Sequence, residues 1–421
     1  MSQLRQEITL FSGIGQMSTT LLGTGLFMVP AIAAGIAGAY SLWAWLLLFV
    51  AICPIALTFA QLGKRFPNAG GTAYFVRQAF NIKLEKSVAW LFISVTPVGV
   101  PPAIALASSF LQQVLPEPLS ASLFAQFITI SLLVIVNLRG AQSSGRLQSF
   151  IAFGILTLII SFWWKGGITA NDLVLPSLSA ENLPSIGVAL AVMFWCFVGI
   201  EAFAHMGEEF KNPQRDFPIA IVAGCFLAGA VYWVGSVVIL KMGAFGTREF
   251  DSASIPWVAE QLFGKEVKIA ISLIGFAACF ASLNLYLQSL SRMVWSQARE
   301  YRPTSRMAKL TKRGVPGNAT LLVAGVALIS CILGTFSGVD LEFFLKLANG
   351  IFVLVYLLAM LAAIKLLVGF NRILAALSLV LCSGVFLCLG TSMLYAVAVF
   401  GLLNLPWKKW STYKLLRSNR M

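Results

Sequence analysis

Long apolar stretches recur along the chain, and short segments between them hold most of the charged residues. A helix that spans a membrane needs about 20 consecutive, mostly apolar residues. By this rule the pattern predicts about twelve spanning helices, of which the last two are short. Their approximate ranges are 10–36, 41–63, 88–113, 120–138, 147–165, 184–205, 219–243, 267–291, 318–338, 342–366, 372–388 and 390–406. The pattern therefore indicates an all-α polytopic membrane protein.

Composition excludes an ordinary soluble domain. The 421 residues are 58% hydrophobic and only 11% charged, whereas a soluble domain carries about a quarter charged residues. The net charge of +14 would suit a nucleic acid, but the basic residues lie in short loops between apolar runs. That distribution reports orientation in a membrane, and it does not indicate a nucleic-acid partner.

The basic residues are concentrated on one side of the predicted membrane. With the N-terminus inside, 24 of the 30 Lys and Arg residues fall in cytoplasmic segments. The outside keeps Lys165, Lys241, Arg248, Lys265, Lys268 and Lys346. The bias predicts an even number of spans with both termini in the cytoplasm. The longest inside loop, 292–318, is too short to bury a core, so residues 1–421 are expected to form a single transmembrane domain with a cytoplasmic, lipid-anchored tail at 407–421.

The first predicted span is too long for a bilayer. Roughly 29 residues of helix would measure about 43 Å, against about 30 Å of hydrocarbon. Its middle contains Gly23-Thr24-Gly25, and glycine removes the steric bar to unwinding. The pattern predicts a break in this helix at Gly23–Gly25. The alternative is that these glycines allow close packing between membrane helices.

The sixth span is also interrupted near its middle, by Gly199 and the carboxylate of Glu201. An intramembrane acid is costly and suggests a functional site. Spans one and six are five helices apart, which is the spacing expected of an inverted repeat with a substrate site at its two broken helices. A helix N-terminus after the first break suits a carboxylate, and carbonyls freed around Phe197–Gly199 suit an ammonium group. A site for both charges is an amino-acid site.

At these residues the chain resembles the amino acid–polyamine–organocation (APC) superfamily. The resemblance rests on Gly23-Thr24-Gly25-Leu26-Phe27 and, more specifically, on two further runs. These are Phe197-Val198-Gly199-Ile200-Glu201 and the segment from Glu208 to Pro218, which contains Asn212-Pro213-Gln214-Arg215. The glycine motif in span one is weak evidence by itself, whereas the combination of the two further runs is specific.

The resemblance implies a LeuT-like five-plus-five inverted repeat with broken helices 1 and 6. Repeat one would cover about 10–165 and repeat two about 184–366, followed by two additional helices at about 372–406. It implies that Gly23, Thr24 and Gly25 receive the substrate carboxylate and that carbonyls at Trp195 and Val198 receive the amino group. Phe197 and Gly199 belong to the same predicted site, with Trp195 as an aromatic lid. Glu201 would brace the unwound segments or titrate.

The resemblance also implies a secondary active transporter in a bacterial inner membrane. Its expected activity is export of methionine, leucine, isoleucine and valine by proton-coupled antiport. A departure from the family concerns the coupling ion, because the lysine that some relatives carry in span five is missing from Leu147–Trp164. Apart from Glu201 the spans offer no intramembrane acid for a cationic side chain, which favours an apolar substrate.

Two further groups of residues have a functional and a purely structural interpretation. His205, the single histidine, lies four residues after Glu201 on the same helix face and would relay protons with it, or would simply end the helix. The charged residues after span six form either an inner-gate salt-bridge network or a solvated turn. They are Glu208, Glu209, Lys211, Arg215 and Asp216.

Several other functions are weighed against export. An uptake permease or exchanger of the same fold, and an amino-acid sensor that moves nothing, would have nearly the same sequence. A membrane enzyme would need clustered catalytic side chains, and a channel a more polar lining, so neither is expected. The seven cysteines form no CxxC pair, and a lone histidine excludes His-rich metal sites. No metal and no cofactor is therefore expected.

Overall fold

Helices account for nearly all of the regular structure. The computed structural model describes residues 4–247, 250–337 and 341–405, and within these residues the only β pairing is a parallel bridge between Ile8 and Phe210. The α-helices are α1 (Leu10–Leu26), α2 (Val29–Ala37), α3 (Ser41–Arg65), α4 (Gly71–Ala79), α5 (Ile82–Ile93), α6 (Thr96–Gln112), α7 (Ser122–Arg139), α8 (Ala141–Lys165), α9 (Leu183–Met193), α10 (Ile200–Phe203), α11 (Pro213–Met242), α12 (Phe250–Phe263), α13 (Lys268–Tyr301), α14 (Gly317–Ser337), α15 (Leu341–Leu366), α16 (Phe370–Cys388) and α17 (Met393–Asn404). Short 3₁₀ turns join several of them, including η4 (Phe194–Phe197), η5 (Ala204–Glu209) and η7 (Arg306–Ala308).

The helices confirm an all-α polytopic membrane protein. Ten segments of the described chain are long and apolar enough to cross a bilayer. Each of the twelve expected spans falls on a helix or a pair of helices. The first and the last of the twelve expected spans are not among these ten segments, because their helices are short. The first span starts with α1, which has 17 residues, and the last lies on the short apolar helix Gly390–Asn404. The repeat division at about 165 and 184 remains a prediction.

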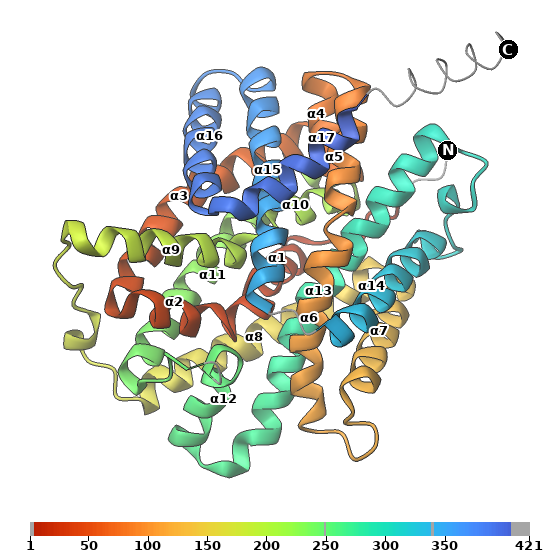
Figure 1. Ribbon diagram of the computed structural model, residues 1–421. Coiled ribbons are helices and arrows are strands. Elements are labelled where there is room, and N and C mark those ends of the chain that lie inside the picture. The colour runs from red at the N-terminus through yellow and green to blue at the C-terminus, as the bar shows by residue number, and fades with distance from the viewer. Residues whose placement is uncertain (1–3, 248–249, 338–340, 406–421) are drawn as a thin grey trace, which may run out of the picture.

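Helix α1 lies at the centre of the molecule. It packs against α8, α11 and α13, while α2 continues beside α9 (Figure 1). From Gly15 to Leu26 every residue of α1 is buried. Since small and polar residues are common in this stretch, neighbouring helices can approach it closely. Helix α16, by contrast, stands at the edge of the molecule and presents apolar side chains such as Phe370 and Val380 outward.

The break in the first span lies at Phe27–Met28, and the predicted position at Gly23–Gly25 is wrong. Both glycines belong to α1, and the new helix α2 starts at Val29 with Pro30 in its first turn. Proline has no N–H to donate and its ring clashes with the carbonyl four residues earlier, here that of Leu26. The chain therefore cannot continue α1 through Pro30.

The two glycines instead permit close packing. A Cβ on Gly23 would lie 2.8 Å from the Ala278 carbonyl oxygen and closer still to Ser282, both on α13. A Cβ on Gly25 would collide with the hydroxyl of Tyr232 on α11. The alternative interpretation of this motif, small residues that seat one membrane helix against its neighbours, is thus present in the structure.

The predicted interruption of the sixth span is confirmed. Helix α9 ends at Met193, η4 follows, Val198 is extended, and Gly199 has φ +135° before the four-residue α10. A side chain rarely adopts this φ, so glycine suits the position. A Cβ there would also lie 2.7 Å from Thr20 Cγ2 on α1. The break of the sixth span therefore contacts the central helix directly.

The sequence did not predict three features of the loops. Helix α13 continues to Tyr301, so Arg292 is a buried helix residue and the assignment of 292–301 to a loop is wrong. Helices α4 and α12 fall in segments that were not expected to span. Both are too short to cross a bilayer, at 9 and 14 residues, and a rule based on 20-residue apolar runs does not detect them.

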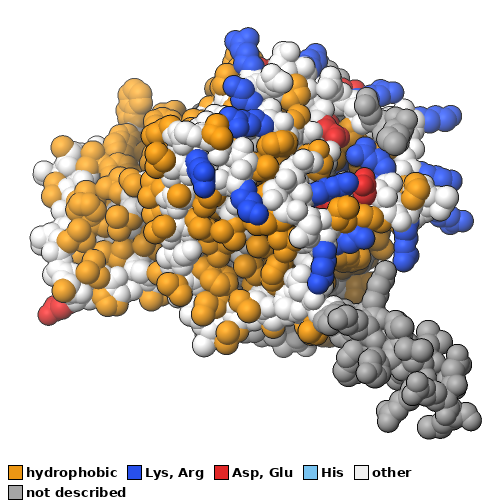
Figure 2. Space-filling view, turned by 90° about the horizontal axis from the view of Figure 1, so that it is seen from above, with side chains coloured by type: hydrophobic (Ala, Val, Ile, Leu, Met, Phe, Trp, Pro, Cys, Tyr) orange, Lys and Arg blue, Asp and Glu red, His pale blue; other side chains and the backbone are white. Residues whose placement is uncertain are grey.

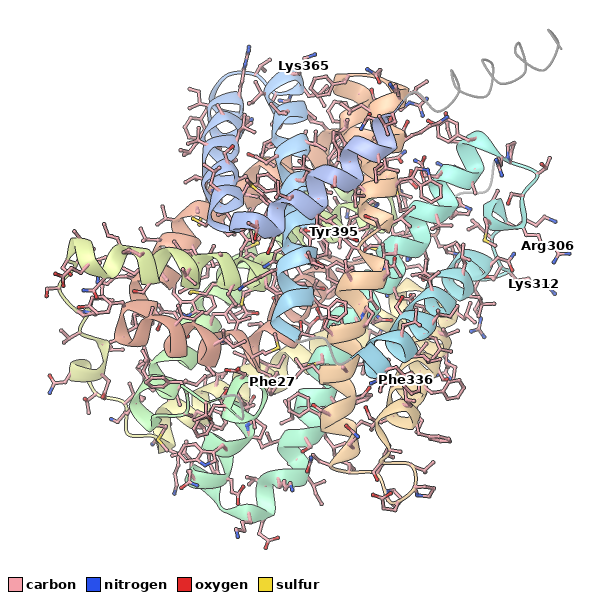
Figure 3. All side chains as sticks on the ribbon, viewed as in Figure 1. Phe27, Arg306, Lys312, Phe336, Lys365 and Tyr395 are labelled. Atoms are coloured by element: carbon pink, nitrogen blue, oxygen red, sulfur yellow. The ribbon has the colours of Figure 1, made fainter. Side chains whose placement is uncertain are left out.

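Basic side chains gather at one end of the described molecule. Figure 2 shows Lys and Arg over one part of the face, beside a broad hydrophobic area. Arg306 and Lys312 project from the loop before α14, whereas Phe336 lies at the opposite end of that helix (Figure 3). The distribution agrees with the predicted segregation of charge between the two sides of a membrane.

The opposite end is held by polar contacts of its own. Lys241 Nζ lies 2.8 Å from Asp172 Oδ2, in the loop between α8 and α9, and Trp43 Nε1 donates to the Pro176 carbonyl at 2.8 Å. The hydrogen bond from Lys241, helped by the backbone and hydroxyl of Thr169, lowers the pKa of Asp172 to about 2. The carboxylate therefore stays charged in any ordinary medium, and the loop stays attached to α11.

Substitution of Gly23 tests the packing of α1. We expect Gly23→Ala to lower the free energy of unfolding by about 1–3 kcal/mol, because the added methyl group overpacks the contact with α13. The measurement is the unfolding midpoint of the purified protein in detergent. Gly154→Ala on α8 is the matched control, since nothing lies within 4 Å of the Cβ that it adds. Equal midpoints for both variants would contradict the packing role.

Candidate substrate site

A small cavity lies where the two broken spans meet. Its volume is only about 20 Å³. This is room for roughly one or two water molecules. It is enclosed by α1, the α5–α6 joint, the break after η4, α13 and α15. The lining residues are Thr20, Leu21, Thr24, Val95, Gly99, Val100, Ala103, Trp195, Val198, Ser282, Leu283, Tyr286 and Phe352. No charged side chain belongs to this lining.

Thr24 and Trp195 connect the two broken spans across the cavity. Trp195 Nε1 donates a hydrogen bond to Thr24 Oγ1 at 3.1 Å. The Trp195 ring also meets Phe352 of α15 edge-on, with 6.2 Å between ring centroids. An indole needs a partner for its N–H when buried, and Thr24 supplies one. The aromatic side chain is thereby fixed over the cavity.

Two carbonyls in the last turns of α1 accept hydrogen bonds from side chains. Ser282 Oγ donates to the Thr20 carbonyl at 2.8 Å, and the Tyr232 hydroxyl donates to the Leu21 carbonyl at 2.5 Å. In an α-helix these carbonyls are the acceptors for the N–H groups of Thr24 and Gly25. Because hydroxyl donors are already in place, the end of α1 can open while both carbonyls stay satisfied.

Glu201 holds the break of the sixth span together. Its side chain is fully buried. Oε2 accepts hydrogen bonds from the Gly199 N–H at 2.9 Å and from the Tyr356 hydroxyl at 2.5 Å, and Oε1 accepts from the Tyr286 hydroxyl at 3.0 Å. The carboxyl group thus ties the unwound backbone to α13 and α15. The bracing that the resemblance implied for Glu201 has this geometry.

The hydroxyl of Tyr356 stands between two acceptors. Besides Glu201 Oε2 it reaches the Phe197 carbonyl oxygen, 3.0 Å away. A phenol has a single proton to donate. With an ionised Glu201 the proton goes to the carboxylate. With a protonated Glu201 the acid can donate to Tyr356, which then donates to Phe197. Protonation of Glu201 thus allows Tyr356 to serve the carbonyl freed by the break, and ionisation of Glu201 draws the phenol proton away from it.

The predicted site residues divide into two groups. Thr24, Trp195 and Val198 line the cavity. Gly23, Gly25, Phe197 and Gly199 lie behind them, where the glycines contact neighbouring helices and the Phe197 carbonyl meets Tyr356. The N-terminus of α2, at Val29, is not part of the lining either.

His205 is buried, and within the described residues it forms no hydrogen bond with Glu201. Its Nδ1 lies 2.9 Å from the Ala69 carbonyl oxygen, and its ring stacks on Phe92 at 4.9 Å. Since a carbonyl only accepts, Nδ1 carries the proton. Nε2 has no hydrogen-bond partner within the described residues. A direct relay between His205 and Glu201 is therefore not formed in this conformation.

A buried ion pair lies at the basic end of the molecule. Glu209, after the broken sixth span, pairs in bidentate fashion with Arg292 of α13, with 2.8 Å between Nη2 and Oε2. The N-terminal segment crosses the same place, because Ile8 N–H donates to the Glu209 carbonyl at 2.9 Å and Lys211 N–H to the Ile8 carbonyl at 2.9 Å. Among the described residues, Glu209 is the one of the five charged residues in this segment that forms a salt bridge, and its partner Arg292 lies outside the segment.

Sequence reasoning missed the hydroxyl groups of the site. Thr20, Ser282, Tyr286 and Tyr356 all lie within long apolar runs and contact the broken spans. Polar side chains that interrupt such runs were a usable signal. This signal was weak, because serine and threonine hydroxyls also donate to carbonyls of their own helix. Thr58, for example, donates to the Pro54 carbonyl.

Broken helices that meet around a small, uncharged cavity in a polytopic membrane protein define a secondary transporter architecture. Comparison with known proteins agrees with this class. A family model described as amino acid permease matches residues 8–406. The chain belongs to this amino acid permease family, which is a family of transporters and not of enzymes.

Individual relatives share most of their length with this chain. The L-methionine/branched-chain amino acid exporter YjeH of Escherichia coli (strain K12) is 45% identical over 411 residues, covering 97% of this chain and 98% of the relative. The putrescine transporter PotE of Haemophilus influenzae is 26% identical over 368 residues, covering 83% and 82%. The cadaverine/lysine antiporter of Escherichia coli (strain K12) is 24% identical over 332 residues, covering 76% and 73%.

Removal of Arg292 tests the buried ion pair. We expect Arg292→Met to lower the free energy of unfolding by about 3–5 kcal/mol, because Glu209 is left as an unpaired buried charge. Adding Glu209→Leu should restore most of the loss, since the pair is then replaced by apolar groups. Unfolding midpoints in detergent measure both effects, with Lys309→Met, at an exposed position, as control. A double variant no more stable than Arg292→Met would contradict the pairing.

Proposed function

We propose that this protein carries neutral, apolar amino acids across a bacterial inner membrane and exports methionine, leucine, isoleucine and valine. The observation that supports this most directly is the lining of the cavity, which is uncharged and has Thr24 and Trp195 as its polar contact. A cationic side chain would need a carboxylate in a site shielded from water. An aliphatic or thioether side chain needs only apolar walls, which Val95, Val100 and Phe352 provide.

Substrate binding in this proposal opens the end of α1. The carboxylate is received at Gly23, Thr24 and Gly25, whose N–H groups become available when the last turn unwinds towards the break at Phe27–Met28. The amino group is received by carbonyls at Trp195 and Val198 and by Phe197. The cavity is too small for an amino acid, so binding must coincide with this rearrangement. Alternating access then follows from movement of the broken spans against the rest.

The proposed direction of transport and the proposed substrates are supported by the relatives together with the cavity lining. The relative at 45% identity is described as an exporter of L-methionine and branched-chain amino acids. The relatives described as transporting putrescine, cadaverine or lysine share 24–26% identity. Both termini are placed in the cytoplasm, because the basic end of the molecule would then face inward.

Proton antiport is proposed to operate through Glu201 and Tyr356. When Glu201 is ionised, Tyr356 donates to it and the Phe197 carbonyl can accept the substrate ammonium group. When Glu201 is protonated, Tyr356 donates to that carbonyl instead and competes with the substrate. Proton and amino acid would thus exclude one another at the break, which is the condition for exchanging them. His205 is a second candidate for the proton, reached only after a rearrangement.

Counterflow in proteoliposomes tests the carrier. Vesicles loaded with methionine should take up labelled methionine, and leucine and valine should compete while arginine and putrescine should not. Trp195→Phe and Thr24→Val each remove the hydrogen bond that an entering amino acid has to break, so we expect each to lower the KM of exchange about 2- to 12-fold, the equivalent of about 0.5–1.5 kcal/mol. The two effects should not add, because both variants remove the same bond.

The opposite result favours the sensor. If folded protein binds methionine but exchanges none, the chain binds an amino acid without moving it. Inhibition of exchange by arginine or putrescine would instead overturn the apolar-substrate assignment. Lys365→Gln serves as a control, since this residue lies away from the cavity at the far end of α15 (Figure 3).

Glu201→Gln separates exchange from proton coupling. The amide cannot ionise, so we expect methionine counterflow to continue while a pH gradient no longer drives methionine accumulation. The readouts are labelled methionine and the fluorescence of a pH dye inside the vesicles. His205→Ala should keep both activities if Glu201 carries the proton. Proton-driven accumulation that survives in Glu201→Gln would exclude this residue as the carrier.

A further inference from the structure

A second and much larger cavity lies outside the substrate site. Its volume is about 790 Å³, within the range of roughly 300–1,000 Å³ typical of ligand pockets. Helices α5, α13, α14 and α17 form its walls, and no lining residue is shared with the substrate cavity. Helix α17 is tied to α5 by a hydrogen bond from Ser87 Oγ to Asn404 Oδ1, 2.9 Å long.

The walls of this cavity are apolar and reach the membrane-facing surface. Trp90 of α5 is 55% exposed, and Leu322 and Val326 of α14 are 46% and 38% exposed. Val399 and Leu403 of α17 line the other side. Residues that are exposed within spanning helices face lipid, so the cavity opens sideways to the hydrocarbon. An opening of this kind admits acyl chains and does not suit a zwitterionic amino acid.

One end of the cavity is basic. Lys86 and Arg302 belong to the lining and are exposed. Lys86 Nζ lies 3.7 Å from the ring centroid of Tyr301. The neighbouring carboxylates have other partners, since Glu85 accepts from the Tyr301 hydroxyl at 2.8 Å and Glu300 pairs with Arg77 at 2.9 Å. Within the described chain, neither Lys86 nor Arg302 has a carboxylate partner.

We propose that this cavity binds one anionic phospholipid. Its phosphate lies between Lys86 and Arg302, and its acyl chains lie between α5, α14 and α17. Basic pockets between membrane helices attract such headgroups, and the apolar walls accept the acyl chains without leaving a polar group unsatisfied. Charge complementarity at one end and apolar walls along the rest select an anionic lipid over a zwitterionic one.

The site is adjacent to the substrate cavity through one joint in the chain. Ser94 and Thr96 line the lipid cavity, and Val95 between them lines the substrate cavity. This is the place where α5 ends and α6 begins. A lipid seated here therefore supports the segment that closes one side of the substrate site.

Lipid enrichment on the full-length protein tests the proposal. The purified protein is equilibrated with mixed micelles of phosphatidylglycerol and phosphatidylcholine, and retained lipid is measured by mass spectrometry. We expect retained phosphatidylglycerol to be enriched over phosphatidylcholine. The double variant Lys86→Gln with Arg302→Gln should lower this enrichment about 30-fold, because each basic residue near an anionic headgroup contributes about 1 kcal/mol, or roughly fivefold.

Matched variants separate the cavity from the general surface. Leu322→Trp fills the cavity and should abolish retention, whereas Leu321→Trp adds the same ring at a neighbouring position, 55% exposed, that is not part of the lining. Lys83→Gln with Arg306→Gln removes two exposed charges, one in the first turn of α5 and one in η7, that do not line the cavity, and should change nothing. No enrichment in the unaltered protein, or equal losses in these controls, would overturn the proposal. Inorganic phosphate should not displace the lipid, and displacement would assign the basic end to a free anion.

Thiol labelling distinguishes lipid from water in the cavity. In a background with the exposed Cys53 and Cys388 changed to Ser, Ser94→Cys should react with a lipid-soluble maleimide faster than with a charged, membrane-impermeant one. Added phosphatidylglycerol should slow the reaction. Faster labelling by the charged reagent would show an aqueous passage and would reject the lipid site, while leaving the counterflow results of the carrier untouched.

Discussion

The structure depends on how a broken helix is satisfied inside a membrane. Unwound backbone exposes N–H and C=O groups that lipid cannot satisfy, at a cost of several kcal/mol for each. At the break of the sixth span, one carboxyl group and two phenol hydroxyls supply the missing hydrogen-bond partners. Glu201 accepts from the Gly199 N–H, and Tyr356 and Tyr286 bind the acid from two other helices. The break can then persist only where α13 and α15 hold it.

That requirement places the rest of the site. Because Gly199 is held against Thr20 of α1, the two broken spans meet at a fixed point, and Trp195 comes within hydrogen-bonding distance of Thr24. Hydroxyl groups on α11 and α13 support the carbonyls of α1 in the same manner. The cavity is thus surrounded by backbone that has alternative donors, and such backbone can change its bonding partners without leaving polar groups unsatisfied.

The sequence predicts the architecture well and the details of the site less well. Apolar runs of about 20 residues locate the spans because the bilayer imposes that length, and Gly199 beside Glu201 marks a break because both are unfavourable in a lipid-facing helix. The position of the first break was wrong, because glycine permits unwinding whereas Pro30 enforces it. Tyr356, Tyr286 and Ser282 become site residues through tertiary contacts between helices far apart in the chain, and the local pattern marks them only as polar interruptions of apolar runs. Arg292 was assigned to a loop because it is charged. Its place inside α13 is explained by the ion pair with Glu209, which is also a tertiary contact.

The small cavity and the shared proton of Tyr356 lead to one consequence for the transport cycle. In the proposed cycle, an amino acid separates Thr24 from Trp195 as it enters, and its ammonium group reaches the Phe197 carbonyl only when Tyr356 no longer donates to that carbonyl. Occupancy by substrate is therefore tied to two bonds that also define the closed conformation. A ligand shifts a conformational equilibrium only through differential contacts with its states, and these two bonds are such contacts. The ion pair between Glu209 and Arg292 is buried, and neither residue belongs to the cavity lining. In the proposed cycle, opening the basic end would separate this buried pair and leave two uncompensated charges, so the ion pair would favour the closed conformation of that end.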